Sequence, residues 1–336
     1  MMSEDCVRHR SIFAADVGKK GAAALAALAF ASLSFAAPAA AQDVLKVAIG
    51  QINNWENQAP TLGQDAGIFK KYNLTLENFG TAGAGETVQA VISGSADIGG
   101  GVGLAGVMRA FSKGAPVRVI LPAFTGTSDL YWYVKADSPI KSLKDATDKN
   151  TIAYSTSGSS SNNIVVAFVE ELGLKAKPTA TGGQPATLTS VMTGQIDIGW
   201  AAPPFGLRDL NEGKIRIVAR GSDIPSLRGQ TVRVLIANAD ALEKKKDAIL
   251  RFIKGYREAV DWMYSDPAAI AMYSKKTDTP PDIVRQSIAD FQPKSTMQSD
   301  ELKDLDGAMR DAVKLKFLDK PLTPEQLKTF VQIPPK

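Results

Sequence analysis

The chain is almost without the two residue types that carry most proton-transfer and metal chemistry. It has one cysteine and one histidine in 336 residues, Cys6 and His9, and neither occurs after position 9. The rest of the chain therefore has no disulfides, no zinc sites built from His and Cys, no Ser-His-Asp triads and no Cys nucleophiles. Carboxylates, Lys, Tyr and Ser remain for acid–base work, but the usual proton shuttle is missing. This composition favours binding over catalysis, and we expect no cofactor.

A large excess of one charge is also missing. Residues 1–41 hold four of the 39 basic and three of the 35 acidic residues, which leaves 35 basic against 32 acidic in the remainder. A small balance of this kind does not predict nucleic-acid binding. The longest basic run, Lys244–Lys246, is flanked by Glu243 and Asp247 and predicts a solvated helix face.

The first 41 residues have the pattern of a secretory signal peptide. A basic start precedes an uncharged apolar run, residues 21–37, and the small-residue pattern Ala37-Pro-Ala39 follows it. The alternative is a retained membrane anchor, which the Ala-rich run and its terminal Pro38 disfavour. No later segment is apolar for long enough to span a bilayer. We therefore expect export to the periplasm, with the mature chain beginning near Gln42.

One segment of the chain is repeated at a distance of one hundred residues. Thr87–Gly99 reads TVQAVISGSADIG, and Thr187–Gly199 reads TLTSVMTGQIDIG. Each copy predicts an amphipathic helix, a Gly turn and a short buried strand. Chance recurrence of a helix–strand turn is the alternative, but similar strands also follow both copies, Val117–Ile120 and Ile215–Val218. The spacing is too long for a solenoid and indicates a duplicated lobe.

Strands and helices alternate from Val44 to about residue 237, which is typical of open, mainly parallel α/β sheets. Two extended stretches, Asp129–Lys135 and Thr231–Ala237, interrupt this rhythm. We interpret them as paired crossings between two lobes, which would form a hinge. The prediction is a first lobe of residues 42–133 and 233–336 and a second lobe of residues 134–232.

The last hundred residues have a helical pattern. Leu242–Tyr264 predicts one long amphipathic helix, and four shorter helices follow it, most of them beginning near a Pro or Asp signal. We expect these helices to pack on the first lobe as scaffold.

Small and polar residues follow several predicted strands. In open α/β sheets ligands bind beyond the carboxyl ends of the strands, where helix N-termini point. The loop Ser155–Ser161 (STSGSSS) is the most distinctive, because its hydroxyl and N–H groups suit an anion. The same serines also suit helix capping, and both interpretations stay open. The Gly99–Val102 run carries less weight, since close packing alone can require glycine.

Two tryptophans and two aspartates invite functional interpretations. Trp55 and Trp200 stand in what we take as equivalent strand-end loops, where they would line a cleft or pack as core. Trp132 and Trp262 are assigned to hinge and scaffold. The pair Asp97 and Asp197 would be a candidate acid–base pair, but each precedes Ile-Gly at a strand start, which favours a structural role.

The chain resembles the substrate-binding proteins of ABC importers in the taurine, aliphatic sulfonate and nitrate group. The resemblance rests on Asn53-Asn-Trp55 after the first strand, the segment Asp65–Leu74, the two Gly-x-x-Asp-Ile-Gly copies and the Ser-rich loop. It covers Val44 to Ala289. Related proteins bind thiamine precursors or aromatic acids, and one is a pyrimidine synthase that consumes an active-site histidine. This chain has no histidine after position 9 to supply that role.

The resemblance implies a type II periplasmic-binding-protein fold: two similar α/β lobes joined by a two-strand hinge, with the C-terminal helices on the first lobe. It also implies a ligand site between the lobes. The implied site residues are Asn53, Asn54, Trp55, Ala84, Gly85, Gly101, Val102, Ser157, Ser159, Ser160, Trp200 and Pro203.

Three functions follow from this reading. The first is a monomeric receptor that hands a small organic anion, sulfonate-like, to an ABC permease and its ATPase. The second is a receptor for a thiamine pyrimidine precursor or an aromatic carboxylate, or a pyrimidine-synthase-like enzyme. The third is a sensory receptor without transport. Because the implied loops hold no Lys or Arg, a cation would come from elsewhere, and Arg208 and Arg109 are candidates.

Overall fold

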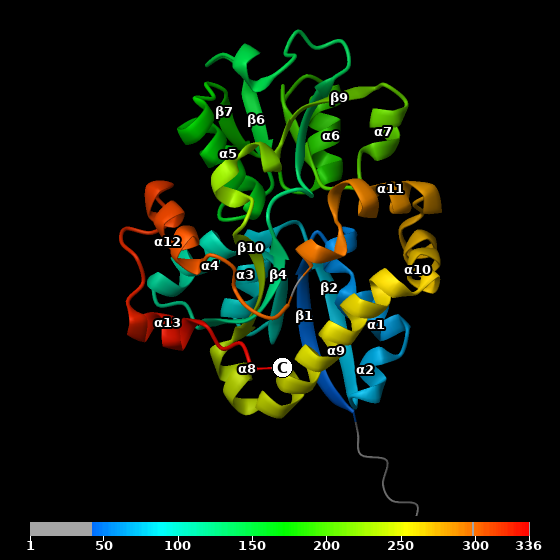
Figure 1. Cartoon of the computed structure of the whole chain (residues 1–336), viewed down its shortest axis with the longest axis vertical. Helices are drawn as coiled ribbons and strands as arrows, with labels where there is room; N and C mark the ends of the chain where they lie inside the picture. Colours follow the sequence, from blue (N-terminus) through cyan, green and yellow to red (C-terminus); the bar gives the residue numbers. More distant parts are fainter. Residues whose placement is uncertain (1–41, 298, 336) are drawn as a thin grey trace, which may run out of the picture. The chain divides into compact units, whose positions relative to one another are not determined.

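The structure is a computed structural model that describes residues 42–297 and 299–335 (Figure 1). The predicted signal peptide, residues 1–41, lies outside the described residues. No helix in the described ranges has the length and apolarity needed to cross a bilayer.

The first sheet has five strands in the order β2-β1-β3-β10-β4. β1 is parallel to β2 and β3, and β10 is antiparallel to β3 and β4. Val47 and Ile49 alternate with Ala48 in β1, and all three are buried because helices cover both faces of this sheet. The strands are β1 (Asp43–Gly50), β2 (Leu74–Thr81), β3 (Ile98–Gly103), β4 (Val117–Thr125) and β10 (Thr231–Asn238).

The second sheet repeats this arrangement with shorter strands. Three strands run in the order β8-β5-β9, and β6 pairs in parallel with β7. A single parallel bridge, Ile152 to Ile198, links β6 to the residue before β8. The strands are β5 (Tyr131–Lys135), β6 (Thr151–Tyr154), β7 (Lys177–Ala180), β8 (Gly199–Ala201) and β9 (Ile215–Arg220).

The two sheets correspond strand for strand, which confirms the predicted type II fold with two similar α/β halves. β1 next to β3 in the first half matches β6 next to β8 in the second, and the bridge of Val47 to Ile98 has its counterpart in that of Ile152 to Ile198. β10 next to β4 matches β5 next to β9. The order β2-β1-β3-β10-β4 thus recurs as β7-β6-β8-β5-β9. Below, "first half" means the part built on the first sheet and "second half" the part built on the second.

The two extended stretches are strands of different sheets and do not pair with each other. β5 pairs with β8 and β9, whereas β10 pairs with β3 and β4. Both are fully or almost fully buried, because each has a neighbouring strand on both sides in its own sheet. The chain passes between the sheets at residues 126–130 and 221–230, directly before β5 and β10. The predicted boundaries, 133/134 and 232/233, lie inside β5 and β10.

Helices flank both sheets. The predicted long helix Leu242–Tyr264 is two helices, because Lys245 leaves helical geometry at φ −119° and ψ 28°. The helices are α1 (Ala59–Asp65), α2 (Ile68–Lys71), α3 (Ala84–Ile92), α4 (Leu104–Ser112), α5 (Ser160–Leu172), α6 (Gln184–Met192), α7 (Leu207–Asn211), α8 (Ala239–Lys244), α9 (Lys246–Ser265), α10 (Pro267–Thr277), α11 (Pro281–Phe291), α12 (Leu305–Lys314) and α13 (Pro324–Phe330).

Most of the C-terminal helices pack on the first half, as expected. α9 buries Ile249, Phe252, Tyr256, Val260 and Met263 at helical spacing against α1, α2 and the first sheet (Figure 1). α12 and α13 contact α4 and β4. α11 is an exception, because it contacts α7 of the second half, where Asn211 Nδ2 donates to Gln286 Oε1 at 3.2 Å. This part of the C-terminal region therefore touches both halves.

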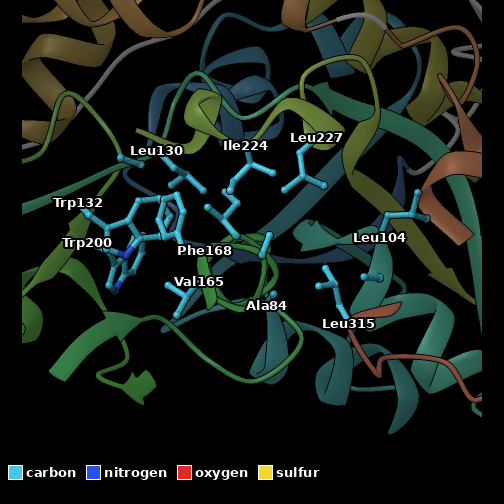
Figure 2. Close-up of a cluster of buried hydrophobic side chains, with 14 of the residues drawn as sticks. Ala84, Leu104, Leu130, Trp132, Val165, Phe168, Trp200, Ile224, Leu227 and Leu315 are labelled. Carbon is cyan, nitrogen blue, oxygen red and sulfur yellow. The ribbon is translucent and has the colours of Figure 1, made fainter. Parts of the chain in front are cut away.

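An aromatic cluster forms the core of the second half. Figure 2 shows Trp132, Phe168 and Trp200 beside Leu130 and Val165. Trp132 meets Phe168 edge-on, with ring centroids 4.9 Å apart, and its Nε1 donates to Ala153 O at 2.9 Å. Trp132 is thus a core residue of β5, and its assignment to a hinge was wrong. Trp262, on α9, donates to Asp266 Oδ2 at 3.0 Å and is scaffold, as predicted.

Candidate functional site

A small cavity of about 30 Å³ lies where the loops of the two halves meet. That volume holds a water molecule or two. The first half supplies the loop after β1, the N-terminus of α3 and the end of β3, and the second half supplies the loop after β6 and β8. The lining residues are Gln51, Asn54, Glu56, Asn57, Ala84, Gly101, Leu130, Ser155, Ser159, Ser160, Ser161, Trp200 and Arg233. We call this the inner cavity.

Hydrogen bonds join the halves on either side of the inner cavity. Gln184 Nε2 donates to Asn54 Oδ1 at 2.6 Å, and Gly85 N donates to Thr156 Oγ1 at 3.0 Å. Beyond these contacts lie two larger hollows. One, of about 370 Å³, includes Asn53 and Asn54, and the other, of about 300 Å³, includes Gly85 and Ser157. Residues of both halves thus bond to each other around the inner cavity.

Glycine is required at two positions of close backbone approach, one between the halves and one within the first half. A Cβ on Gly106 of α4 would lie 2.1 Å from the Gly158 carbonyl oxygen, which is backbone and cannot rotate away. In the Gly99–Gly103 run, Gly101 has φ +68°, and a Cβ there would lie 2.6 Å from Gly50 O. Close backbone approach therefore explains these glycines, in line with the packing alternative raised for this run.

The Ser-rich loop both caps a helix and lines the cavity. Ser159 is the N-cap of α5, and its hydroxyl accepts from Asn162 N at 3.1 Å. Ser160 accepts from Arg233 Nη1 at 3.2 Å. Ser161 bonds Ser155 and Ser159 through its hydroxyl at 3.1 Å and 3.0 Å. Ser157 is exposed and lines only the 300 Å³ hollow.

Arg233 of β10 is the cation of the inner cavity. It forms an ion pair with Asp129, whose side chain is fully buried, and its own side chain is 5% exposed. The guanidinium carbon also lies 4.3 Å from the centroid of the Phe124 ring. Of the two arginines suggested from the sequence, Arg208 is exposed on α7 and Arg109 lines the 300 Å³ hollow.

Two buried donors among these residues have no acceptor in the described structure. They are Trp200 Nε1 and Arg233 Nε. Buried donors nearly always have a hydrogen-bond partner, so exceptions need an explanation. Both residues line the inner cavity.

Glu56 is the least expected residue of the cavity. It is 4% exposed and forms no ion pair in the described residues, although Arg233 lies near enough to act on it through space. Its Oε1 accepts from Asn54 Nδ2 at 3.0 Å and from Asn57 Nδ2 at 3.4 Å, and its Oε2 accepts from Gln292 Nε2 at 3.2 Å. Burial raises the pKa of Glu56 to about 7, with Asp129 adding to the shift and Arg233 opposing it.

The sequence-predicted site residues fall into three groups. Six of the twelve line the inner cavity, three line the outer hollows without it, and three are elsewhere. Asn54, Ala84, Gly101, Ser159, Ser160 and Trp200 line the inner cavity; Asn53, Gly85 and Ser157 line the outer hollows; Trp55, Val102 and Pro203 do neither.

Trp55 and Trp200 do not stand at equivalent positions. Trp55 follows β1, whose counterpart is β6, whereas Trp200 lies inside β8, the counterpart of β3. Trp55 is fully buried and meets Tyr273 edge-on, with centroids 5.2 Å apart. Trp55 is therefore a core residue, whereas Trp200 belongs to the core of the second half and also lines the inner cavity.

Sequence reasoning missed Glu56 and Arg233 as site residues. Glu56 stood inside the loop Gln51–Asn57, where the signal was a carboxylate directly after a buried Trp. Arg233 was hidden in a strand, where a charged residue inside the run TVRVLIA was the available signal.

Asp97 and Asp197 have a structural role, but they bond the neighbouring strand, whereas the sequence predicted that they cap the turn from the preceding helix. Asp97 Oδ2 accepts from Lys46 N at 2.9 Å and from Lys245 Nζ at 2.8 Å. Asp197 Oδ2 accepts from Thr151 N at 2.8 Å and from Thr151 Oγ1 at 2.9 Å. Each carboxylate ties the start of one strand to its parallel neighbour. In the described ranges, no group of three or more His, Cys, Asp or Glu residues is arranged to hold a metal ion.

A family model described as NMT1/THI5 like matches residues 37–270, more than half of the chain. The chain belongs to this family. A search of curated proteins found no match.

Solved structures with the same fold include proteins that bind small anions. The alkanesulfonate-binding protein SsuA from Xanthomonas axonopodis pv. citri, bound to MOPS, has a TM-score of 0.71 at 15% identity, over 87% of this chain and 98% of that one. The periplasmic aliphatic sulphonate binding protein SsuA from Escherichia coli scores 0.64 at 18% identity, over 87% and 92%. The periplasmic nitrate-binding protein NrtA from Synechocystis PCC 6803 scores 0.64 at 13% identity, over 86% of each chain. At these identities the likeness establishes the periplasmic-binding-protein fold.

Proposed function

We propose that this protein is a periplasmic receptor that binds a small organic anion, sulfonate-like, between its halves. The observation that carries the proposal is the pair of buried donors without acceptors, Trp200 Nε1 and Arg233 Nε, on residues that line the inner cavity. An anion supplies acceptor atoms to such donors, and charge-assisted hydrogen bonds are the stronger kind. The hydroxyl of Ser160, next to Arg233, adds a further polar group.

Charge balance favours an anion of low charge. Arg233 is already paired with Asp129, and Glu56 adds a second carboxyl to the cavity region. A singly charged head group fits this balance better than a dianion, because uncompensated buried charge is costly.

Delivery to a membrane permease driven by an ATPase belongs to the same proposal. The solved structures with this fold include a ligand-binding component of an ABC-type import system from Staphylococcus aureus, which supports a transport partner. A sensory receptor that presents the ligand to a signalling protein is the competing role. Adjacent reading frames for a permease and an ATPase would support transport, and their absence would favour sensing.

Periplasmic location is tested at the N-terminus. We expect N-terminal sequencing of periplasmic protein to begin between Ala40 and Asp43. Intact leader on membrane-bound material would contradict export.

A nitrogen heterocycle, such as a thiamine pyrimidine precursor, is the second candidate ligand. The supporting observation is Glu56, because a buried carboxylate beside Trp200 offers an acceptor to ring amino groups. Catalysis in which the protein consumes its own histidine is not open to this chain, since no histidine follows His9.

The test is a thermal-shift screen of sulfonates, carboxylates, nitrate and thiamine precursors, followed by calorimetric titration. For an anion, Ser160→Ala should weaken binding about 10- to 100-fold, because a charge-assisted bond contributes about 1.5–3 kcal/mol. Ser157→Ala is the matched control, since Ser157 does not line the inner cavity, and it should leave affinity unchanged. Equal effects of the two substitutions would remove the inner cavity from the site. Stabilisation by thiamine precursors alone would favour the second candidate.

A further inference from the structure

Glu56 is a buried carboxyl group without a dedicated cation. Arg233 is committed to Asp129 and Ser160, and the three groups that touch Glu56 are neutral amides of Asn54, Asn57 and Gln292. Amide donors stabilise the ionised carboxylate but do not balance its charge. A buried charge without a counter-ion is the arrangement in which a carboxyl group most readily takes up a proton.

Glu56 shares its surroundings with a second buried carboxyl group, Asp129, whose pKa burial also raises while Arg233 opposes the shift. From β10 Glu56 faces Arg233, and from the segment before β5 it faces Asp129. From α9 it faces Tyr256 and Tyr264, and from α10 it faces Tyr273. Burial raises the pKa of each of these three phenols, so they stay neutral at physiological pH.

An anion in the inner cavity acts directly on this carboxyl group. Glu56 and Arg233 line the same cavity, which must widen from about 30 Å³ to admit a sulfonate, and an anion bound there lies beside both. A second negative charge at short range disfavours the ionised carboxylate, and screening by water is weak for a group as buried as Glu56.

If the protein is an anion receptor, Glu56 determines which anion it accepts. We propose that the inner cavity takes up its anion together with one proton, which passes from solvent to Glu56, and that it therefore prefers singly charged anions to doubly charged ones. The carboxylate of Glu56 becomes a neutral acid, and the cavity region then carries only the Arg233–Asp129 pair and the ligand. One proton compensates a monoanion but leaves a dianion with an unbalanced charge.

The pKa of Glu56 sets the pH range of this effect. Without ligand it is about 7, and a bound anion raises it further. The bound state then holds more protons than the free state above pH 7. Affinity should therefore be nearly constant below about pH 6 and fall about tenfold per pH unit above 7, until the pKa of the bound state is reached.

The experiment is calorimetric titration of the signal-free chain with methanesulfonate and nitrate, which stay singly charged from pH 5.5 to 8.5. Titrations at pH 7.5 in buffers of different ionisation enthalpy measure the protons taken up. We expect uptake between about 0.5 and 1 proton per anion and at least tenfold weaker binding of sulfate at pH 8. Glu56→Gln should abolish both the uptake and the pH dependence and keep binding at pH 8 at least as tight. Glu258→Gln, a matched change at a half-exposed carboxylate paired with Lys71, should change neither.

Each contrary result has a distinct meaning. Binding without proton uptake by the wild-type protein overturns this inference and leaves the receptor proposal standing, and it does so whether or not Glu56→Gln folds. Loss of anion binding at every pH in a folded Glu56→Gln variant also overturns it, because Gln keeps the neutral state that this inference assigns to Glu56 in the bound protein. Failure of both anions to bind overturns the anion proposal, and this inference with it.

Discussion

The two copies of the repeat share their internal hydrogen bonds almost one for one. Thr87 Oγ1 lies 2.6 Å from Thr81 Oγ1, and Thr187 Oγ1 lies 2.6 Å from Thr181 Oγ1. Thr87 also donates to Gly83 O and Thr187 to Gly183 O, at 3.3 Å and 3.1 Å. The turns that follow use Gly94 and Gly194 at φ 74° and 77°. These residues shape the backbone, and both copies keep them.

The copies differ in what they present to the cleft. At the first position of the repeat helix, the first copy has Ala84, which lines the inner cavity, and the second has Gln184, which reaches across to Asn54. The loop after β1 brings Glu56 and amides, whereas the loop after β6 brings serines. The two halves therefore share a backbone arrangement but form an asymmetric site, because the residues that face the opposite half differ between them.

Of the variants considered, Gly106→Ala should disrupt the contact between the halves most strongly. In Gly106→Ala the new Cβ would meet the Gly158 carbonyl oxygen, so the halves cannot approach as they do here. We expect anion affinity to fall at least about 100-fold, because only a small fraction of molecules would reach the closed arrangement. The unliganded protein should not melt earlier, since Ala favours the α4 helix over Gly.

Calorimetric titration and solution scattering check this expectation. The variant should keep its ligand-free radius of gyration when anion is added. Gly229→Ala is the control, because a Cβ there meets nothing within 4 Å. Unchanged affinity in Gly106→Ala would mean that binding does not require this contact.

Glu56, in the loop after β1, should make the free energy of unfolding depend on pH. The Ser-rich loop of the second half holds no carboxyl group and cannot have this effect. Because the pKa of Glu56 in the folded protein is about 7, above its unfolded value, the folded state holds the proton more tightly. The contribution of Glu56 to the free energy of unfolding is fully favourable below about pH 4.5 and is lost as pH rises to 7. Glu56→Gln removes this loss and should raise the free energy of unfolding by on the order of 2–3 kcal/mol at pH 8, relative to its effect at pH 4.5.

Denaturant unfolding of both proteins across pH 4.5–8.5 measures this difference. Both proteins are measured without ligand, so that the effect on stability is not mixed with an effect on ligand binding. A constant difference across the range would mean that Glu56 ionises normally in the folded protein.

Gln184 of the second copy can be replaced by Ala, the residue at the matching position 84 of the first copy. Gln184→Ala removes the bond to Asn54 and leaves Ala202 N, which donates to Gln184 Oε1 at 2.7 Å, without its acceptor. We expect the free energy of unfolding to fall by about 1–2 kcal/mol and anion affinity to fall several-fold. Gln195→Ala, at an exposed position of the same half, is the control for thermal melting and titration. No change in either property would show that this bond between the halves contributes nothing.

The smallest effects are expected at the matched aspartates. Asp97→Ala and Asp197→Ala each release a backbone N–H, of Lys46 and Thr151, from a carboxylate. Each should lower the free energy of unfolding by about 1 kcal/mol and the melting temperature by about 2–4 °C, with unchanged anion affinity. Thermal melting and calorimetric titration of both variants test these two expectations. A tenfold loss of affinity in either one would contradict a purely structural role.

The duplication was readable from the sequence, because the helix, the Gly turn and the buried strand of each copy are local patterns. Half of the site residues implied by the family resemblance line the inner cavity. β5 and β10 interrupt the helix–strand alternation as extended stretches, and only their pairing with β8, β9, β3 and β4 places them inside the two sheets.

By itself the sequence determined the fold class, the repeat, and the lack of histidine and cysteine chemistry after position 9, since these depend on residue identity and short-range periodicity. Only the tertiary structure decided the charges of the cavity. Arg233 meets Asp129 across 104 residues, and Gln292 meets Glu56 across 236. Burial of Glu56 beneath tyrosines of α9 and α10 likewise depends on how those helices pack. The pKa of a carboxyl group follows the solvent and charges around it, and no local pattern in the chain specifies those.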